Sequence, residues 1–99
     1  MVRLSLLMTK CRSRNKKHMD KVRRNPCLIC LSPYADAHHL TFSEPKALGM
    51  KVSDIYTVPL CRTHHSELHA FGSEILWWEL QGVSPTEWIY ERFGISLPV

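Results

Sequence analysis

The alternation of apolar and polar positions divides the chain into three regions. Residues 1–24 have many cationic positions and no clean apolar period, which is typical of a disordered arm or of a solvated helix. Residues 27–71 contain short apolar runs of strand length, and residues 73–99 have the spacing of short helices. The pattern predicts an α+β fold, with a basic arm over 1–24 and one domain over 25–99.

The middle region predicts two strands followed by a helix. Residues 36–42 and 55–60 are the predicted strands, and residues 41–54 form a long loop between them. A helix is predicted over Arg62–Phe71, because the next residue, Gly72, is a favourable residue just after a helix end. This order of elements brings the end of the second strand directly to the start of the helix.

The last region predicts two short helices from their end signals. Ser73 and Gly82 bound a helix over residues 74–81, and a capping-box sequence at Ser84 begins a second helix that stops at Gly94. Apolar residues of these helices are expected to enter the core: Leu76, Trp77, Leu80, Trp88, Ile89 and Phe93.

Cysteine and histidine spacing indicates a zinc knuckle. Cys27 and Cys30 are separated by two residues, and Cys61 and His64 repeat that spacing at the predicted helix start. Two such pairs can bring four ligand atoms to one tetrahedral zinc ion. We therefore expect structural Zn²⁺ at these four residues, whereas Cys11 lies outside the pattern and is expected to be a free thiol.

The surplus histidines indicate a second metal site. Beyond the knuckle, residues 38–69 contain His38, His39, His65 and His69. The last two are four residues apart on the predicted helix, so they share one face and can bind one ion. Neighbouring residues of a regular strand point to opposite faces, so His38 and His39 can share one site only where the strand is short or distorted. Three imidazoles on one ion leave coordination positions open, which is typical of a catalytic site.

Composition is that of an ordinary globular protein. The chain has 99 residues, 44% hydrophobic and 22% charged, which argues against disorder throughout. A domain of this size buries a modest core and needs an additional staple such as a metal. No apolar run approaches the roughly 20 residues of a membrane span, and no export signal is recognised. We therefore expect a cytoplasmic location, no membrane insertion and no disulfides.

The charge is distributed unevenly. Residues 1–24 carry nine Lys or Arg and one Asp, a net charge of +8, whereas residues 25–99 carry four Lys or Arg and eight acidic residues, a net charge of −4. A basic arm on a mildly acidic body indicates a polyanionic partner, with nucleic acid favoured over an anionic membrane surface.

The combined motifs resemble the HNH endonuclease family, and most of all its small phage- or prophage-associated members with a zinc knuckle. The resemblance implies a ββα-metal core over residues 27–71, with helices over 73–99 beside it. It implies that His38, His65 and His69 hold a catalytic divalent metal (Mg²⁺, Mn²⁺, Ni²⁺ or Zn²⁺). The motifs that carry it are Cys27-Leu28-Ile29-Cys30, Ala37-His38-His39-Leu40, Pro59-Leu60-Cys61-Arg62-Thr63-His64-His65 and His69.

The resemblance also assigns a general base and leaves two positions open. His39, the second histidine of its pair, would take the proton of the attacking water. Many members have a cysteine as fourth knuckle ligand, so either His64 or His65 can close the zinc site here. The middle asparagine of the family is absent, and either the Asp54 side chain or the Tyr56 carbonyl can replace it.

These features predict a metal-dependent endonuclease that hydrolyses DNA with weak sequence preference, using one metal and a histidine base. The basic arm would supply affinity, and its removal would leave the catalytic site intact. The alternative is a non-catalytic zinc-dependent nucleic-acid-binding module, which explains the knuckle and the arm but not the surplus histidines. The cationic residues expected to contact phosphates are Lys16, Lys17, Arg23, Arg24, Lys46, Lys51 and Arg62.

Overall fold

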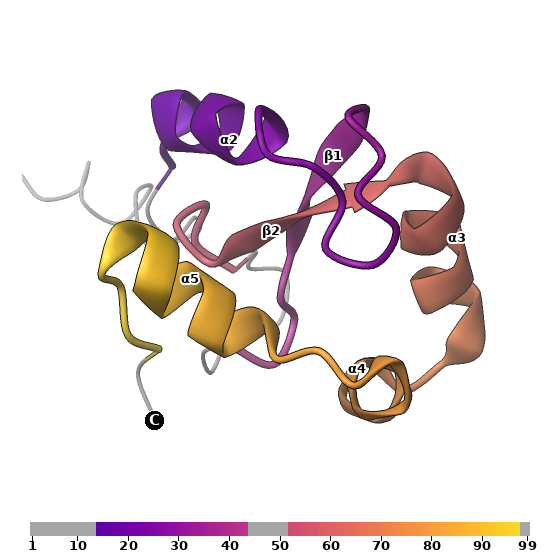
Figure 1. Cartoon of the computed structure of the whole chain (residues 1–99). Helices are drawn as coiled ribbons and strands as arrows, with labels where there is room; N and C mark the ends of the chain where they lie inside the picture. Colours follow the sequence, from indigo (N-terminus) through magenta and orange to yellow (C-terminus); the bar gives the residue numbers. More distant parts are fainter. Residues whose placement is uncertain (1–13, 44–51, 98–99) are drawn as a thin grey trace, which may run out of the picture.

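The structure is a computed structural model that describes residues 14–43 and 52–97 (Figure 1). These residues form a small α+β fold in which helices surround a two-stranded antiparallel sheet, so the α+β part of the predicted fold class is confirmed. Among the described residues, no helix has both the length and the apolar character needed to cross a membrane. The elements are α2 (Lys16–Arg23), β1 (Ala35–His39), β2 (Thr57–Cys61), α3 (Arg62–Phe71), α4 (Glu74–Gln81) and α5 (Pro85–Phe93).

Both predicted strands exist, but their bounds differ from the prediction. The register pairs Ala35 with Cys61 and His39 with Thr57. β1 ends at His39, earlier than predicted, because the chain then turns, with the backbone N–H of Ser43 donating to Leu40. β2 begins at Thr57 because the preceding residues form a turn in which the Thr57 hydroxyl donates to the carbonyl of Asp54.

The predicted helix ends are confirmed. α3 ends at Gly72, and α4 is capped by the Ser73 hydroxyl, which accepts from a backbone N–H of its first turn. α5 begins in the same way at Ser84. Gly94 closes α5 with φ of 70°, a left-handed conformation that costs glycine little. Local capping chemistry therefore fixes these boundaries.

The core lies between β2 and the surrounding helices, and it corrects part of the prediction. Trp77 and Ile89 are buried as predicted. Leu76 and Leu80 were predicted to be core residues, but their exposed fractions are 45% and 65%. α4 is only about two helical turns long, and the side of the helix that carries Trp77 and Trp78 faces the core. Leu76 and Leu80 are four residues apart, so they share another side of the helix, and that side faces water.

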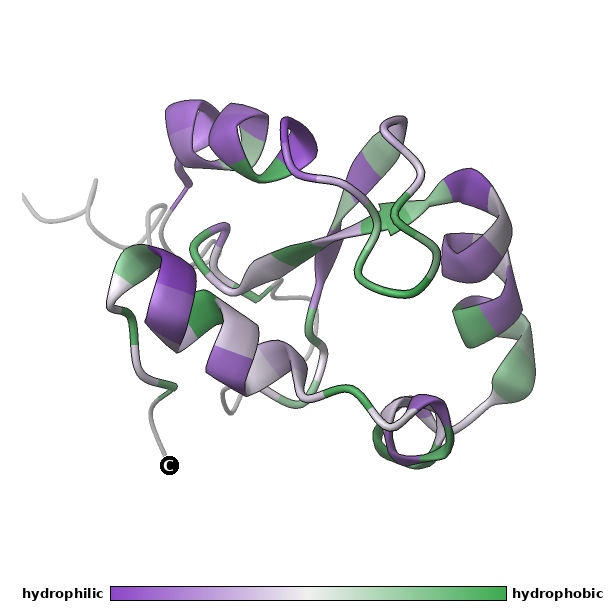
Figure 2. Ribbon diagram, in the orientation of Figure 1, coloured by the Kyte–Doolittle hydropathy of each residue, from purple (hydrophilic) through white to green (hydrophobic). Residues whose placement is uncertain are grey.

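The part of the basic arm that the structure describes is a docked helix. α2 is mainly hydrophilic in Figure 2, consistent with one of the two states expected for the arm. Its inner side, however, buries Val22 completely and His18 almost completely. The His18 ring lies against Phe93 of α5, with ring centroids 4.5 Å apart. α2 also contacts both strands, so it is packed against the domain.

The burial of Val22 gives a stability test of this docking. Val22→Ala should lower the free energy of unfolding by about 2 kcal/mol, because it removes buried apolar surface and leaves a cavity. The matched control is Lys21→Ala on the same helix, which should stay within about 0.5 kcal/mol of the parent. Urea unfolding followed by tryptophan fluorescence measures both. Equal stabilities for the two variants would contradict docking.

Candidate metal centres

The first cluster consists of Cys27, Cys30, Cys61 and His64, whose ligand atoms lie within 4.8 Å of one another. Cys27 and Cys30 stand on the loop before β1, Cys61 ends β2, and His64 lies in the first turn of α3. The Cys30 and Cys61 sulfurs are 3.8 Å apart, and His64 Nδ1 lies 3.2 Å from the Cys61 sulfur. Elements far apart in sequence therefore converge on one point.

This arrangement fits a metal ion such as zinc. A tetrahedral ion with Zn–S distances of about 2.3 Å places two sulfurs about 3.8 Å apart, which agrees with the Cys30–Cys61 separation. Of the two open candidates for the fourth ligand, His64 lies with the cysteines. His65 instead belongs to the second cluster.

The backbone around Cys27 favours its thiolate. The loop closes with the N–H of Cys27 donating to Ser32, and Leu31 takes a left-handed φ of 66°. Burial alone raises the pKa of the Cys27 thiol, but backbone hydrogen bonds from Cys30, Cys61 and Ile29 lower it to about 7. Because the thiolate is the form that binds metals, the loop prepares this residue as a ligand.

The second cluster consists of His38, His65 and His69, whose ligand nitrogens also lie within 4.8 Å of one another. His38 comes from β1 and is buried, whereas the other two come from one face of α3. The ring centroid of His38 lies 4.9 Å from that of His65 and 5.5 Å from that of His69. The fold thus brings together the three histidines that the sequence resemblance grouped.

Two carboxylates hold two rings of this cluster. Glu74 Oε2 lies 2.7 Å from His38 Nε2, and Asp36 Oδ2 lies 3.2 Å from His65 Nδ1. Each contact leaves the other ring nitrogen available to an ion, and such carboxylates orient metal-binding histidines and raise their basicity. Burial raises the pKa of Glu74, but hydrogen bonds from His38, Thr41 and Trp78 lower it to about 2, so this carboxylate is ionised.

The sequence did not identify these two carboxylates. Glu74 is an acidic residue in the first turn of a capped helix, a position where acids are common for helix stability alone. Asp36 is the second residue of β1 and belongs to no motif of its own. Only the folded arrangement, in which each meets a histidine about 30 residues away or more, gives them a role at the site.

His39 lies outside both clusters and has its own carboxylate. Its Nε2 lies 2.9 Å from Asp54 Oδ1, and its side chain is 32% exposed. Burial raises the pKa of Asp54, but the hydrogen bonds with His39 and with the backbone N–H of Asn15 lower it below its usual value. Of the two candidates for the missing asparagine, the Asp54 side chain contacts His39. The Tyr56 carbonyl instead accepts from the N–H of Leu40.

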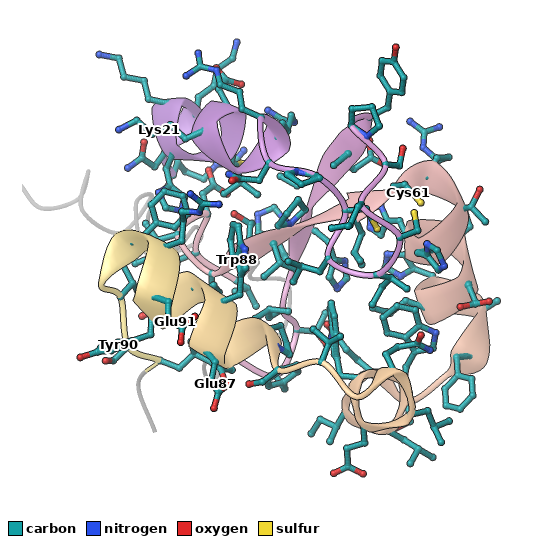
Figure 3. All side chains as sticks on the ribbon, viewed as in Figure 1. Lys21, Cys61, Glu87, Trp88, Tyr90 and Glu91 are labelled. Atoms are coloured by element: carbon teal, nitrogen blue, oxygen red, sulfur yellow. The ribbon has the colours of Figure 1, made fainter. Side chains whose placement is uncertain are left out.

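The expected phosphate-binding residues that the structure describes lie in two places, at the start of α3 and on or next to α2. Arg62 is exposed at the start of α3, with its Nε 3.1 Å from Asp36 Oδ2. Lys21 was not among the expected residues, but its side chain also points outward from α2 (Figure 3). Lys46 and Lys51, together with Cys11, lie outside the described residues. The expected residues of the arm are exposed on or next to α2: Lys16, Lys17, Arg23 and Arg24.

Comparison with known proteins places residues 7–91 in a family described as "Protein of unknown function (DUF968)". An "Uncharacterized protein YdfU" of Escherichia coli (strain K12) is 41% identical over 54 residues, which are 54% of this chain and 16% of that relative. The chain therefore spans about a sixth of the length of the relative it matches. No solved structure gave a significant match.

The first cluster predicts a bound metal that the fold requires. Cys30→Ala should lose the ion and unfold, because metal ions at such sites contribute on the order of 10 kcal/mol to small domains. Cys11→Ala is the matched control and should retain both metal and melting temperature. Elemental analysis and thermal melts, with and without a chelator, measure this. A Cys30→Ala protein with parental metal content and melting temperature would show that the cluster is not a metal site.

Proposed function

We propose that this chain, which belongs to the DUF968 family of proteins of unknown function, is a metal-dependent endonuclease of the HNH type that hydrolyses DNA. The observation that carries the proposal is the open cluster of three imidazoles with a separately held histidine, His39, next to it on the same strand. β1, β2 and α3 would form the ββα-metal core, and the first cluster would hold structural zinc.

The three-histidine cluster would hold the catalytic ion. His38, His65 and His69 each offer one ring nitrogen, and three protein ligands leave positions open for phosphate or water. The resemblance allows Mg²⁺, Mn²⁺, Ni²⁺ or Zn²⁺ there, and a bound divalent cation supplies Lewis acidity toward a phosphate oxygen. Glu74 and Asp36 keep the His38 and His65 rings turned so that one nitrogen of each remains available.

His39 is assigned the role of general base, which takes a proton from the attacking water. Its Nε2 is held against the ionised carboxylate of Asp54, which favours the tautomer that carries hydrogen on Nε2. Nδ1 then has the free lone pair and can accept a proton from an attacking water. The 32% exposure of this side chain leaves it open to solvent and substrate. A buried carboxylate thus fixes which ring nitrogen acts.

The substrate is assigned from charge. Exposed cations on α2 and at Arg62 suit a phosphate backbone, and contacts of this kind attract DNA without reading its bases. A cavity of about 150 Å³ opens beside the catalytic cluster, between Thr41, His69 and Glu74. Weak sequence preference follows, because the affinity comes from the backbone of the nucleic acid.

A non-catalytic zinc-dependent nucleic-acid-binding module is the second candidate. The first cluster and the cationic helix are enough for that function. It leaves unexplained why Glu74, Asp36 and Asp54 each hold a histidine outside the first cluster. A plasmid-nicking assay with added divalent metal distinguishes the two candidates, because only the nuclease converts supercoiled plasmid to the nicked form.

His39 and His65 should fail in different ways. His39→Ala should leave metal binding nearly unchanged while DNA cleavage falls about 10²–10⁴-fold, since the base is gone and added metal cannot replace it. His65→Ala should weaken metal binding, so excess metal should partly restore its cleavage. Calorimetric titration with Mn²⁺ and plasmid nicking over a range of metal concentrations measure both variants. Parental cleavage by His39→Ala would remove this residue from the mechanism.

Neutralising the outer side of α2 should reduce the salt dependence of DNA binding. The double variant Lys16→Gln/Lys17→Gln should lower the slope of log K against log salt by roughly 2, one unit for each phosphate that the protein no longer neutralises. Binding is measured by fluorescence anisotropy in a His39→Ala background, so that the DNA stays intact. The control is the removal of a cation elsewhere, Arg92→Gln on α5, which should leave the slope unchanged. An unchanged slope in the double variant would exclude α2 from the interface.

A further inference from the structure

We propose that the basic arm is also a positioning element for His39, through a hydrogen bond from the Asn15 backbone to Asp54. This inference rests on the role of His39 in the proposed function. It extends that role to a segment that the sequence assigned to affinity alone. Asn15 and Asp54 are positioning residues in this scheme, because they act on the reaction through the His39 ring.

Asp54 links the arm to the histidine with its two oxygens. Oδ1 lies 2.9 Å from His39 Nε2, and Oδ2 accepts from the backbone N–H of Asn15 at 2.7 Å. The Arg14 Nε lies 3.9 Å from the same Oδ2. The Asp54 side chain is only 8% exposed, so water has little access to replace a missing donor. The Asp54 carboxylate therefore links the position of the arm to the orientation of the His39 ring.

The N–H of Asn15 is held in place by the fold of the arm. Asn15 is the N-cap of α2, and its side-chain oxygen accepts from the N–H of His18 at 3.0 Å. α2 in turn is docked by the buried Val22 and by the contact of His18 with Phe93. The donor to Asp54 is thus presented at the first turn of a packed helix.

Both oxygens must be occupied for the carboxylate to have one orientation. Without the Asn15 donor, Asp54 can rotate and its hydrogen bond to His39 loses its fixed direction. The His39 ring would then sample both neutral tautomers, and only one of them leaves Nδ1 free. Removing residues 1–24 would delete this donor to Asp54, so the proposal predicts that truncation disturbs the catalytic site as well as DNA affinity.

The same helix serves two partners on its two sides. Lys16 and Lys17 are exposed and available to a polyanion, whereas His18 and Val22 are buried and the backbone N–H of Asn15 donates to Asp54. Loss of the outer charges should weaken DNA binding, and loss of the inner N–H should slow the reaction of bound DNA. Affinity and turnover can therefore be separated by variants only one or two positions apart.

The test removes the Asn15 N–H in two ways. Asn15→Pro deletes the donor but also restricts φ, which is −146° here. A semisynthetic chain with an ester in place of the Arg14–Asn15 peptide bond deletes the donor without the proline ring that restricts φ. Asn15→Ser is the matched control, because it keeps the N–H and is a good N-cap. All are prepared as the 99-residue chain with zinc added.

Two measurements are made on each protein. Nitrogen NMR of the His39 ring reports which nitrogen carries the proton, and steady-state kinetics on DNA separates kcat from KM. The ester and Asn15→Pro should mix the two tautomers and lower kcat about tenfold with KM nearly unchanged, a typical loss for a supporting hydrogen bond. Asn15→Ser should behave like the parent in both measurements.

The outcomes separate this inference from the proposed function. Unchanged His39 nitrogen signals in the ester would overturn the positioning role, whatever the effect on stability. A rise in KM with unchanged kcat would also overturn it, because the arm would then act through affinity alone. If the parent does not cut DNA, the proposed function fails. The ring tautomer in the ester then decides the link between the arm and His39 without reference to activity.

Discussion

A sheet of two five-residue strands has too few hydrogen bonds and too little buried surface to stand alone in water, and the rest of the structure depends on relieving that constraint. β2 is buried along its whole length, with Pro59 accepting a hydrogen bond from Leu28 of the cysteine loop. The first cluster joins that loop to the end of β2 and the start of α3. A bound ion there would staple the sheet at the place where its hydrogen bonding ends.

Pairing of histidines with carboxylates organises the site that the sheet supports. His38 and His39 are neighbours on a strand, so their side chains leave in opposite directions. On one side of the strand His38 meets the carboxylate of Glu74, and on the other side His39 meets that of Asp54. The adjacent histidines are thereby divided into a buried ring inside a cluster of three and a partly exposed ring outside it.

The sequence predicted what local chemistry determines and missed what tertiary contact determines. Helix ends were correct because a cap such as Ser73 or a left-handed glycine such as Gly94 acts within one turn. Strand ends were shifted because turns outside the strands decide where pairing stops. Leu80 was misplaced because a two-turn helix can bury either of two apolar stripes, and the tryptophans decide which. The acid that holds His38 lies 36 residues away, beyond any local pattern.

The docking of α2 through two buried side chains has a consequence for the motions of the protein. A helix anchored by two buried side chains is expected to open at a smaller free-energy cost than the strands beneath it, while the rest of the domain stays folded. Amide protons of α2 would then exchange with solvent long before those of β2. The molecule would then spend part of its time as a folded domain with α2 detached, and a polyanion that binds one of these two states more tightly would raise the population of that state.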